Sequence, residues 1–583
     1  GNPGLTVANA ITLGAGTTTV DTQAFTYTLS GVASGTGGMS KIGSGVLNLT
    51  GASTFTGATT VAAGTLNVTG SLVSAVTVNS AATITGTGTV GALNVLAGAF
   101  VSPGAPGTTD TATLTVTGAA TLAGTYTVNL TPSANDRITA GGALTLGGAL
   151  AVVPTVPGTF SQFNQLFTLA SGATRTGTFA NVSGLDQVGI AFAPVVDYTA
   201  TAAVLRLAPQ SLLVLGNRFG GISGNQLEVA LAFDRAVAAG YNPQAFFNVY
   251  ANGGSALPQT LRQMSGEQRA TERRVVLDTN RVFRESALDR LNGGLASLGG
   301  QQVSSTDGDR TLTFWLRGAG SWAKSRTNGA ATAFNAEQRG VITGLDWAKG
   351  GLTVGGAFHY TSTNVEYQVL GGSSNVETVG GTAYAGYRQD GGVVVNGGVS
   401  VAGARTNGSR AITLPSFAQT LAGTTTGTTY QAFGELAWDL AGSADTRIEP
   451  FARFSYVKAD MGALAETGGV AALTAAKQGY DITVTNLGAR FGGNVAGGKV
   501  ALSAGASWQN TGGDRDAATV IGIPAVGQNG LIRSVQMDRD AVSLQADVGV
   551  NVSDTIRFSL GYSGLIGKRN DDHGGRATLN FAF

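Results

Sequence analysis

Apolar and polar residues alternate through positions 311–583, in segments of about ten residues, which is the length that a tilted strand needs to cross a bilayer. In the last segment Leu579, Phe581 and Phe583 share one face of a strand, while Arg576 and Thr578 share the other. The same alternation recurs at 312–317, 352–360, 447–456, 499–509 and 556–562. The pattern predicts strands of either a membrane β-barrel or a soluble sandwich.

The connections between these segments favour the barrel. Short turns, most of them marked by glycine, lie at 349–351, 390–392, 441–443, 496–498 and 553–554, and they alternate with mostly long polar loops at 323–335, 362–375, 405–427, 460–479 and 510–536. Such alternation is typical of outer-membrane barrels, and it predicts roughly twelve antiparallel strands. We interpret the aromatic residues near the strand ends as interfacial girdles: Trp322, Trp347, Tyr360, Tyr384, Tyr387, Trp438, Tyr480, Trp508 and Tyr562.

Residues 1–207 follow a different pattern, in which short β-branched runs are separated by Gly, Ala and Asn. Runs such as 46–49, 65–68 and 92–95 recur at intervals of roughly 20 to 27 residues, the length of one solenoid coil. A single coil cannot bury its apolar face, whereas stacked coils can. A sandwich also has Gly-rich, weakly charged strands, but the repeat favours a right-handed β-solenoid (β-helix). The chain is therefore expected to be all-β apart from a linker.

That linker lies between the two β regions, where residues 224–292 take on helical spacing. We divide the chain into a passenger at 1–210, a helical linker at 211–310 and a barrel at 311–583. The stretch 266–291 is densely charged, so it is either a solvated helix or a helix inside the polar lumen of the barrel. Its candidate contact residues are Arg269, Arg273, Arg281, Arg284 and Asp289.

Charged residues on the inward face of the predicted strands have two interpretations. They either line a water-filled lumen and pair across strands, or they bind the linker helix through ion pairs. The lumen-facing candidates are Arg317, Glu435, Glu449, Arg453, Arg490, Asp547 and Arg557.

Composition narrows the class of protein. Only 12% of the residues are charged and 89 are glycine, which excludes a helical cytosolic enzyme and a charge-rich disordered protein. None is cysteine, so a secreted chain of this kind must be held by strand pairing rather than by disulfides. The net charge of +1 gives no argument for a nucleic-acid partner. The sequence has neither an apolar run long enough for a transmembrane helix nor a signal peptide. Because a barrel requires export, we interpret Gly1 as a mature or truncated start.

The sequence predicts no catalytic residue, cofactor or metal site. The only histidines, His359 and His573, lie in the barrel region, so residues 1–207 cannot form a Ser-His-Asp triad. Asp110, Asp136 and Asp186 lack the spacing of a calcium loop. We interpret His359 as a structural residue and predict that the protein is not an enzyme.

Two stretches carry a family resemblance. Residues 41–51 and 54–68 resemble the passenger-associated repeat of bacterial autotransporters, the type V secretion proteins, and residues 311–583 resemble the autotransporter translocator barrel. The resemblance implies a barrel in the outer membrane with its passenger at the cell surface. It also implies contact with outer-membrane lipid, a monomeric barrel, and recognition of Leu579, Phe581 and Phe583 by the barrel-assembly machinery.

Some autotransporters release the passenger by cleavage between paired asparagines inside the barrel. Here Asn280 precedes Arg281 and Asn292 precedes Gly293, so no such pair exists and we expect no autocatalytic release. The predicted function is display of an adhesive or self-associating passenger with an unknown surface ligand. The alternatives are an outer-membrane channel with a solenoid accessory domain and a hydrolytic passenger.

Overall fold

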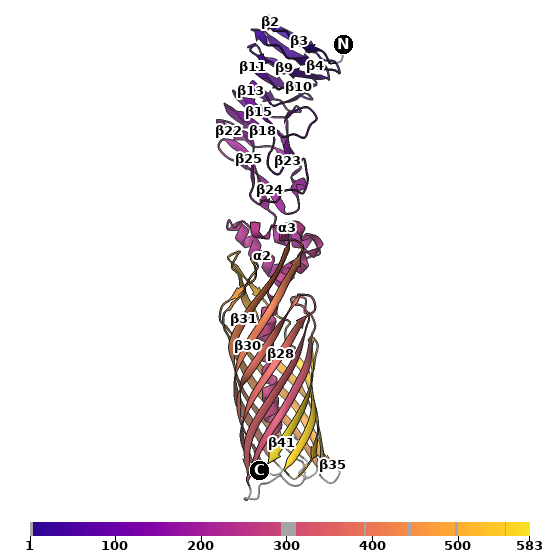
Figure 1. Cartoon of the computed structure of the whole chain (residues 1–583), viewed down its shortest axis with the longest axis vertical. Helices are drawn as coiled ribbons and strands as arrows, with labels where there is room; N and C mark the ends of the chain where they lie inside the picture. The colour runs from indigo at the N-terminus through magenta and orange to yellow at the C-terminus, as the bar shows by residue number, and fades with distance from the viewer. Residues whose placement is uncertain are drawn as a thin grey trace. The chain divides into compact units, whose positions relative to one another are not determined.

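The structure is a computed structural model, and it describes residues 4–292, 310–389, 392–440, 446–495, 499–553 and 555–582. Contacts divide the chain into two units. The first comprises Gly1–Ser211 and Asn242–Ala251, and the second comprises Leu212–Tyr241 and Asn252–Phe583. The first unit is built of short parallel strands and the second contains long antiparallel strands (Figure 1).

Two parallel sheets form the solenoid of the first unit. Over residues 4–211, the first sheet has nine strands in the order β1 (Thr6–Val7), β4 (Thr26–Leu29), β7 (Val46–Leu49), β10 (Thr65–Val68), β12 (Thr83–Gly86), β14 (Phe100–Pro103), β17 (Thr125–Leu130), β20 (Ala149–Pro154) and β23 (Asn181–Ser183). The path of the second sheet contains β3 (Thr17–Asp21), β6 (Gly38–Ile42), β9 (Thr59–Val61), β11 (Ser71–Val78), β13 (Thr89–Val95), β15 (Thr113–Val116), β18 (Arg137–Ala140), β21 (Leu166–Ser171), β25 (Ala202–Pro209) and β24 (Phe192–Tyr198). Four further strands pair beside this path: β8 (Ala52–Ser53), β16 (Ala120–Leu122), β19 (Ala143–Leu146) and β22 (Thr174–Gly177). Strand β2 (Ile11–Leu13) pairs with β5 (Ala33–Gly35).

Each coil of the solenoid places the same kind of residue above its neighbour. Leu47, Leu66, Ile84 and Val101 are successive register partners, and all four are fully buried. Stacking removes apolar side-chain surface from water, and each Å² removed stabilises the folded chain by about 25 cal/mol. The prediction of a β-solenoid is confirmed at the level of its stacked parallel strands.

One buried ammonium group joins three coils. The Nζ of Lys41 donates to Thr22 Oγ1 at 2.8 Å, to the Gly43 carbonyl at 2.7 Å and to the Ala63 carbonyl at 2.9 Å. Burial lowers the pKa of Lys41 to about 8, and the charge of Asp21 opposes that shift. Lys41 therefore links the coils through hydrogen bonds rather than through an ion pair.

The solenoid ends in antiparallel strands and an aromatic cluster. Strand β25 pairs antiparallel with β21 and β24, next to the short helix η1 (Leu185–Val188). The ring of Phe163 lies 5.2 Å from that of Phe247 and 5.1 Å from that of Tyr250, measured between centroids, which attaches α3 (Phe247–Asn252) to this end. Gln244 of η2 (Gln244–Phe246) accepts a hydrogen bond from the Phe163 amide at 2.9 Å.

Twelve strands close a barrel over the described part of residues 310–582. They are β26 (Arg310–Ser325), β27 (Phe334–Lys349), β28 (Leu352–Tyr367), β29 (Gly372–Arg388), β30 (Val393–Leu414), β31 (Phe417–Trp438), β32 (Thr446–Met461), β35 (Gln478–Val495), β36 (Val500–Gly513), β39 (Asp540–Asn551), β40 (Ile556–Gly567) and β41 (Asn570–Ala582). Neighbouring strands pair antiparallel, and β26 closes the barrel on β41. The predicted twelve-stranded barrel is therefore confirmed.

Two of the predicted long loops are strands instead. The segments 362–375 and 405–427 continue β28, β29, β30 and β31, and only residues 415–416 separate β30 from β31. Their Thr, Ser, Gly and Asn residues form regular hairpins. The sequence pattern missed them because their buried face mixes apolar residues, such as Val365 and Ile412, with polar ones, such as Thr406 and Arg410.

The girdle assignment is wrong for two tyrosines. Trp322, Trp347 and Tyr387 are exposed on the outer face, but Tyr384 and Tyr480 are buried inside the barrel. Tyr384 and Tyr387 lie three positions apart on one strand, so they must point to opposite faces. The hydroxyl of Tyr384 accepts a hydrogen bond from Trp315 Nε1 at 3.0 Å.

Helices and a small sheet belong to the long-loop end of the barrel. The helices are α1 (Leu212–Arg218), α2 (Asn225–Ala238), η3 (Gly254–Ala256) and α4 (Leu257–Met264), and the sheet contains β33 (Leu464–Ala465), β34 (Thr474–Ala475), β37 (Thr519–Ile523) and β38 (Gln528–Ile532). Asn225 of α2 donates to the Arg533 carbonyl at 2.8 Å and accepts from the Arg533 amide at 2.9 Å. These two bonds join the helices to the loop sheet. Among the described residues, none of the helices combines the length and the apolar character that a membrane-spanning helix requires.

Candidate functional site: the helix inside the barrel

Helix α5 (Glu267–Leu291) runs inside the barrel and contacts β28 to β32 (Figure 1). Its 25 residues span about 37 Å at 1.5 Å per residue, enough to cross the hydrocarbon core of a membrane. Nineteen of the 25 are buried. Gly266 precedes the helix with a φ of 73°, and a Cβ there would lie 2.3 Å from Leu473, so glycine suits this turn. The charged stretch that the sequence singled out therefore lies in the lumen.

The first turns of α5 are held by a buried group of four charged residues. Arg269 donates to Glu466 at 2.8 Å and to Glu272 at 2.7 Å. Arg410 of β30 donates to the same Glu466 carboxylate at 2.8 Å and 3.0 Å. The side chains of Arg269 and Arg410 are 1% exposed, and that of Glu466 is 0% exposed. One carboxylate thus joins the helix to a strand and to the loop between β32 and β35.

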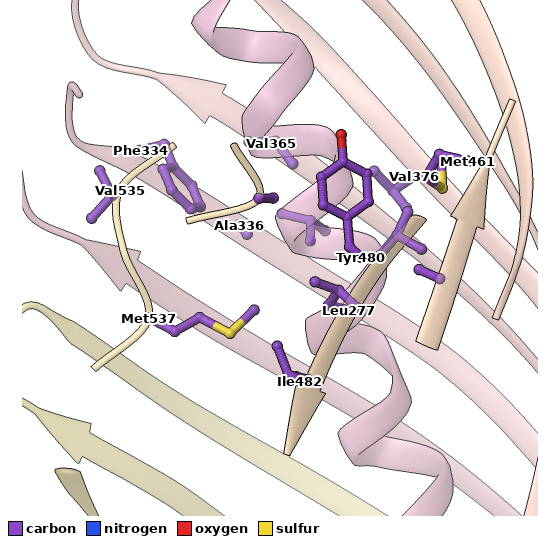
Figure 2. Close-up of a cluster of buried hydrophobic side chains, with 14 of the residues drawn as sticks. Leu277, Phe334, Ala336, Val365, Val376, Met461, Tyr480, Ile482, Val535 and Met537 are labelled. Atoms are coloured by element: carbon purple, nitrogen blue, oxygen red, sulfur yellow. The ribbon is translucent and has the colours of Figure 1, made fainter. Parts of the chain in front are cut away.

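The next turn of α5 passes through an apolar layer. Val275, Val276 and Leu277 pack against inward-facing side chains that include Phe334 and Tyr480 (Figure 2). The same cluster contains Ala336, Val365, Val376, Met461, Ile482, Val535 and Met537. A lumen wetted on every level would not contain such a layer. This level of the barrel is instead packed like a protein core.

The middle of α5 carries a second charged level. Glu285 accepts from Arg453 at 2.9 Å and from Gln545 at 2.9 Å. Arg284 donates to Ser455 Oγ at 2.9 Å, and Arg281 is ion-paired with Asp572. On the other side of the helix the ring of Phe283 stacks on that of His359 with centroids 3.5 Å apart. The helix is thus held from several directions by strands distant in sequence.

The last turn of α5 meets the third charged level. Asp289 accepts from Arg317 at 3.0 Å and lies 3.5 Å from Arg576. Arg290 donates to both carboxylate oxygens of Asp346, at 2.6 Å each. Charge-assisted, bidentate hydrogen bonds of this kind are stronger than hydrogen bonds between neutral groups.

Asn292 follows the helix and enters a network of buried charges. Its Nδ2 donates to Glu435 at 3.1 Å, and its Oδ1 accepts from Arg490 at 2.8 Å and from Asn396 at 2.7 Å. Glu435 also accepts from Arg453 at 2.7 Å and from Arg490 at 2.8 Å. Arg490 continues the network to Glu449 at 2.6 Å. Gly293 lies outside the described residues.

The remaining candidates are placed as follows. Asp547 accepts from Arg576 at 2.6 Å, on the inner wall. Arg557 shares the inward parity, and its Nε has no hydrogen-bond partner among the described residues. Arg273 is buried and donates to the Arg269 carbonyl at 3.2 Å. Leu579 and Phe581 lie in β41, while Phe583 falls outside the described residues.

Sequence reasoning missed Arg410 and Glu466, which hold the first turns of the helix. Both lie in segments that the sequence predicted as loops. Their partners are separated by 56 residues for Arg410 with Glu466 and by 197 for Arg269 with Glu466. No local pattern carries such a pairing. The alternation along β30, which also buries Ala402 and Ala404, is the one local signal that would have predicted an inward-facing Arg410.

A cavity remains beside α5, on the side away from the strands that it contacts most. It is lined by Arg274, Asp278 and Arg281 of the helix and by Ser321, Gln338 and Thr511 of the wall, among others. In the described part of the chain, no group of three or more His, Cys, Asp or Glu residues is placed to hold a metal ion. The side chains described above hold a helix in place through ion pairs and packing.

Fold and site together define a class of protein: an outer-membrane β-barrel closed by an internal helix and preceded by a β-solenoid. Residues 314–563 match the family model of the autotransporter β-domain, and residues 39–68 match the passenger-associated transport repeat. The chain carries an autotransporter β-domain and a passenger-associated transport repeat, in the order that its sequence predicted. Its barrel is located in the outer membrane, with the passenger at the cell surface.

Two solved translocator structures are among the matches. The translocator domain of the autotransporter NalP from Neisseria meningitidis is 13% identical, with a TM-score of 0.39, covering 54% of this chain and 99% of that one. The β-domain of the Bordetella autotransporter BrkA is 19% identical, with a TM-score of 0.34, covering 47% of this chain and all of that one.

Two curated relatives correct the prediction about enzyme activity. Both are named extracellular serine protease, from Serratia marcescens, and are 26% and 25% identical over 56% and 71% of this chain. The chain spans only 31% and 39% of their length. The prediction that the protein is not an enzyme is contradicted by these relatives. It rested on the missing histidines of residues 1–207, and the composition of one segment does not determine the activity of a whole protein.

Proposed function

We propose that the barrel carries the passenger to the cell surface and that α5 then stays in the lumen as both plug and tether. One observation carries this proposal: charged residues at three levels of the helix pair with residues of the barrel, at the first level with Glu466 of a loop and at the other two with inward-facing residues of the wall. A linker helix surrounded by water would not need such partners, because water would solvate its charges. In the lumen they replace the water that the helix displaces.

The proposal is tested by crosslinking the helix to the wall with a short bifunctional thiol reagent. The chain contains no cysteine, so a Glu285→Cys/Arg453→Cys pair has no background. The Arg453 guanidinium and the Glu285 carboxylate lie 2.9 Å apart at the ends of two long side chains, so two cysteines there are too far apart for a direct disulfide but within reach of a short bifunctional thiol reagent. We expect that reagent to form a crosslink that changes migration on a gel. The matched control is Glu285→Cys/Phe454→Cys, because Phe454 is 53% exposed on the outer face.

A crosslink with position 454 that equals the one with position 453 would place the helix outside the lumen. So would free reaction of a cysteine at 285 with a membrane-impermeant thiol reagent added to intact cells.

The proposed partners of the barrel are outer-membrane lipid and the barrel-assembly machinery. Phe581 of β41 lies 6.3 Å from Phe314 between ring centroids, on the outward parity. We expect deletion of Phe583 to reduce the amount of folded barrel in the membrane. A Phe583→Tyr variant, which keeps the terminal ring, is the control. Equal amounts of heat-modifiable barrel in all three forms would remove this residue from the signal.

For the displayed solenoid we propose adhesion or self-association. Support comes from its rows of Thr, Ser and Asn side chains, which are uncharged donors and acceptors. Settling of cells that display the full chain, compared with cells that carry residues 212–583 only, measures this role. Equal settling of the two strains would contradict it.

A second candidate function is proteolysis, which the names of the two relatives favour. Residues 1–207 contain no histidine, so a Ser-His-Asp centre would need its base from elsewhere. A fluorophosphonate probe applied to cells that express the natural protein tests this function. Labelling that requires one particular serine supports proteolysis, and absence of labelling contradicts it.

A further inference from the structure

The cavity beside α5, here named the lumen cavity, has a volume of about 100 Å³. One water molecule needs about 10 to 15 Å³ of such space, so the cavity has room for several waters or for one small organic molecule. Asp571 and Asp572 line it and lie directly after the turn at 568–569, which joins β40 to β41 at the long-loop end of the barrel. The lumen cavity therefore lies close to the mouth of the barrel that faces the outside of the cell.

Part of the lining of the lumen cavity is apolar. The wall contributes Phe334 and Ile482 to this part (Figure 2). The helix contributes Leu277, and the loop before β39 contributes Met537, a flexible side chain that adapts to the shape of its neighbours. Binding sites for small molecules are commonly lined in this way, with a few polar groups that fix the orientation of the ligand. This part of the cavity suits the apolar body of a ligand.

One carboxylate of the helix projects into the lumen cavity. The side chain of Asp278 lines the cavity and is 48% exposed, although 19 of the 25 residues of α5 are buried. Among the described residues its one ion-pair partner is Arg274, whose Nε lies 3.5 Å from Asp278 Oδ2 and has no hydrogen-bond partner. The Asp278 carboxylate therefore keeps acceptor positions that face the cavity.

The other charged side chains of the lining are held by bonds of their own. The ion pairs are Arg281 with Asp572, Arg284 with Glu285 and Asp571 with Arg326. Arg274 donates to the Val535 carbonyl at 2.8 Å, and Asp538 accepts from the Asn570 amide at 2.8 Å. A molecule that enters the cavity meets the negative charge of Asp278 without breaking any of these bonds.

We propose that the lumen cavity binds a small organic ammonium ion, with its ammonium group on Asp278 and its apolar body against Leu277 and Met537. The inference rests on the proposed function, because the cavity exists only while α5 occupies the lumen. An ammonium group has donors and no acceptor, which matches a carboxylate with free acceptor positions. An anion of the same shape is repelled by Asp278, and a neutral molecule leaves the carboxylate without a counter-charge.

The test compares three probes of similar size that differ in charge: benzylammonium, benzyl alcohol and benzoate. The full chain is folded in lipid vesicles and carries Ser321→Cys as its single cysteine, since the unmodified chain has none. Ser321 lines the cavity from β26, so the rate at which this cysteine reacts with a small uncharged thiol reagent reports whether the cavity is occupied. The matched control is Ser373→Cys, at an exposed position of β29.

We expect benzylammonium, at about ten times its dissociation constant, to slow the reaction of Ser321→Cys about tenfold, because about nine in ten cavities are then occupied. The alcohol and benzoate at the same free concentration leave the rate nearly unchanged. Adding Asp278→Asn removes the protection by benzylammonium. Adding Glu337→Gln, which changes a partly exposed carboxylate outside the cavity, keeps it. The reaction of Ser373→Cys is the same with every probe, and heat-modifiable migration checks that each variant is folded.

Four results would overturn the inference: a Ser321→Cys chain that does not react even without a probe, no protection by benzylammonium, equal protection by all three probes, or protection that survives Asp278→Asn. The Glu285→Cys/Arg453→Cys crosslink, measured in the same vesicles, separates this inference from the proposed function. A normal crosslink together with any of the four results overturns the binding site alone. Absence of the crosslink overturns the position of α5 in the lumen, and the binding site with it.

Discussion

The solenoid and the barrel lumen differ in how many charged side chains they contain. Residues 42–109 contain no charged side chain, and the coils hold together through stacked aliphatic residues such as Leu66 and Ile84. The lumen instead buries whole groups of charges, with Glu435 placed between Arg453 and Arg490. Both regions are sheets that enclose an interior, yet one interior is mostly apolar and the other combines several levels of ion pairs with one apolar layer.

The difference follows from what fills each interior. A coil is closed by its own side chains and by the nearly identical coil on either side, so small and aliphatic residues suffice. The barrel is wider and needs a separate helix inside it. We hypothesise that charges with partners on distant strands hold that helix in one position and one rotation about its axis. Apolar contacts alone would define its position and rotation less well. Four changes test the comparison.

The largest effect is expected where a buried charge loses its partner. Glu466→Ala leaves Arg269 and Arg410 buried without their shared carboxylate, which costs about 3 to 5 kcal/mol. We expect the heat-modifiable barrel to unfold at a lower temperature and α5 to become sensitive to protease. Arg410→Met/Glu466→Leu removes both charges of one pair and serves as the control. An unchanged unfolding temperature in Glu466→Ala would show that the ionic interior contributes nothing to seating the helix.

The next effect concerns the outer face of the same barrel. Leu502 is 46% exposed toward lipid, and an Arg there costs about 2 to 4 kcal/mol near the bilayer centre. Ser503, one position along, pairs with Asp547 on the inner parity. We expect Leu502→Arg to lower the yield of folded barrel in the membrane, and Ser503→Arg to be tolerated. Equal yields would contradict the assigned parity.

The solenoid contains one buried carboxylate, and its titration provides the third test. Burial raises the pKa of Asp136 to about 6, while amide hydrogen bonds from Asn129 and Ala112 oppose the shift. Because the pKa is higher in the folded state than in the unfolded chain, the free energy of unfolding falls as pH rises from about 4 through 6. The total loss is about 3 kcal/mol at 1.36 kcal/mol per pKa unit.

This pH dependence is measured as the urea concentration at which the passenger of the full chain becomes sensitive to proteinase K, between pH 4 and pH 8. We expect lower resistance at pH 8 and a flat profile for Asp136→Asn. A wild-type profile that is already flat would show that the carboxylate is not destabilised by burial.

The smallest effect is expected for a charge pair at the surface. Arg339 and Glu337 are 2.6 Å apart, but their side chains are 77% and 36% exposed. Such pairs contribute about 0 to 1 kcal/mol. We expect Arg339→Ala to leave barrel yield and unfolding temperature nearly unchanged. A loss as large as that of Glu466→Ala would mean that burial does not distinguish the two kinds of pair.

The barrel could be predicted from sequence because its signal is local. Alternation with a period of two places Leu502 and Phe454 outside, with Ser503 and Arg453 opposite them, and each strand carries this information by itself. In the hairpin extensions at 362–375 and 405–427 the buried face mixes apolar and polar residues, such as Val365 and Arg410, so the same rule did not detect them.

By itself the sequence determined the number of strands, their parity, the repeating coils and the charged helix, because each depends on residues within a few positions or within one repeat. Only the tertiary structure decided which charges meet. Glu466 pairs with Arg269 and Arg410, Tyr384 bonds to Trp315, and an apolar layer surrounds Val276 inside a lumen that was expected to be polar. These contacts join strands, loops and a helix that lie far apart in the chain. They form only once the barrel has closed around α5, because closure brings those distant residues to the same level of the lumen.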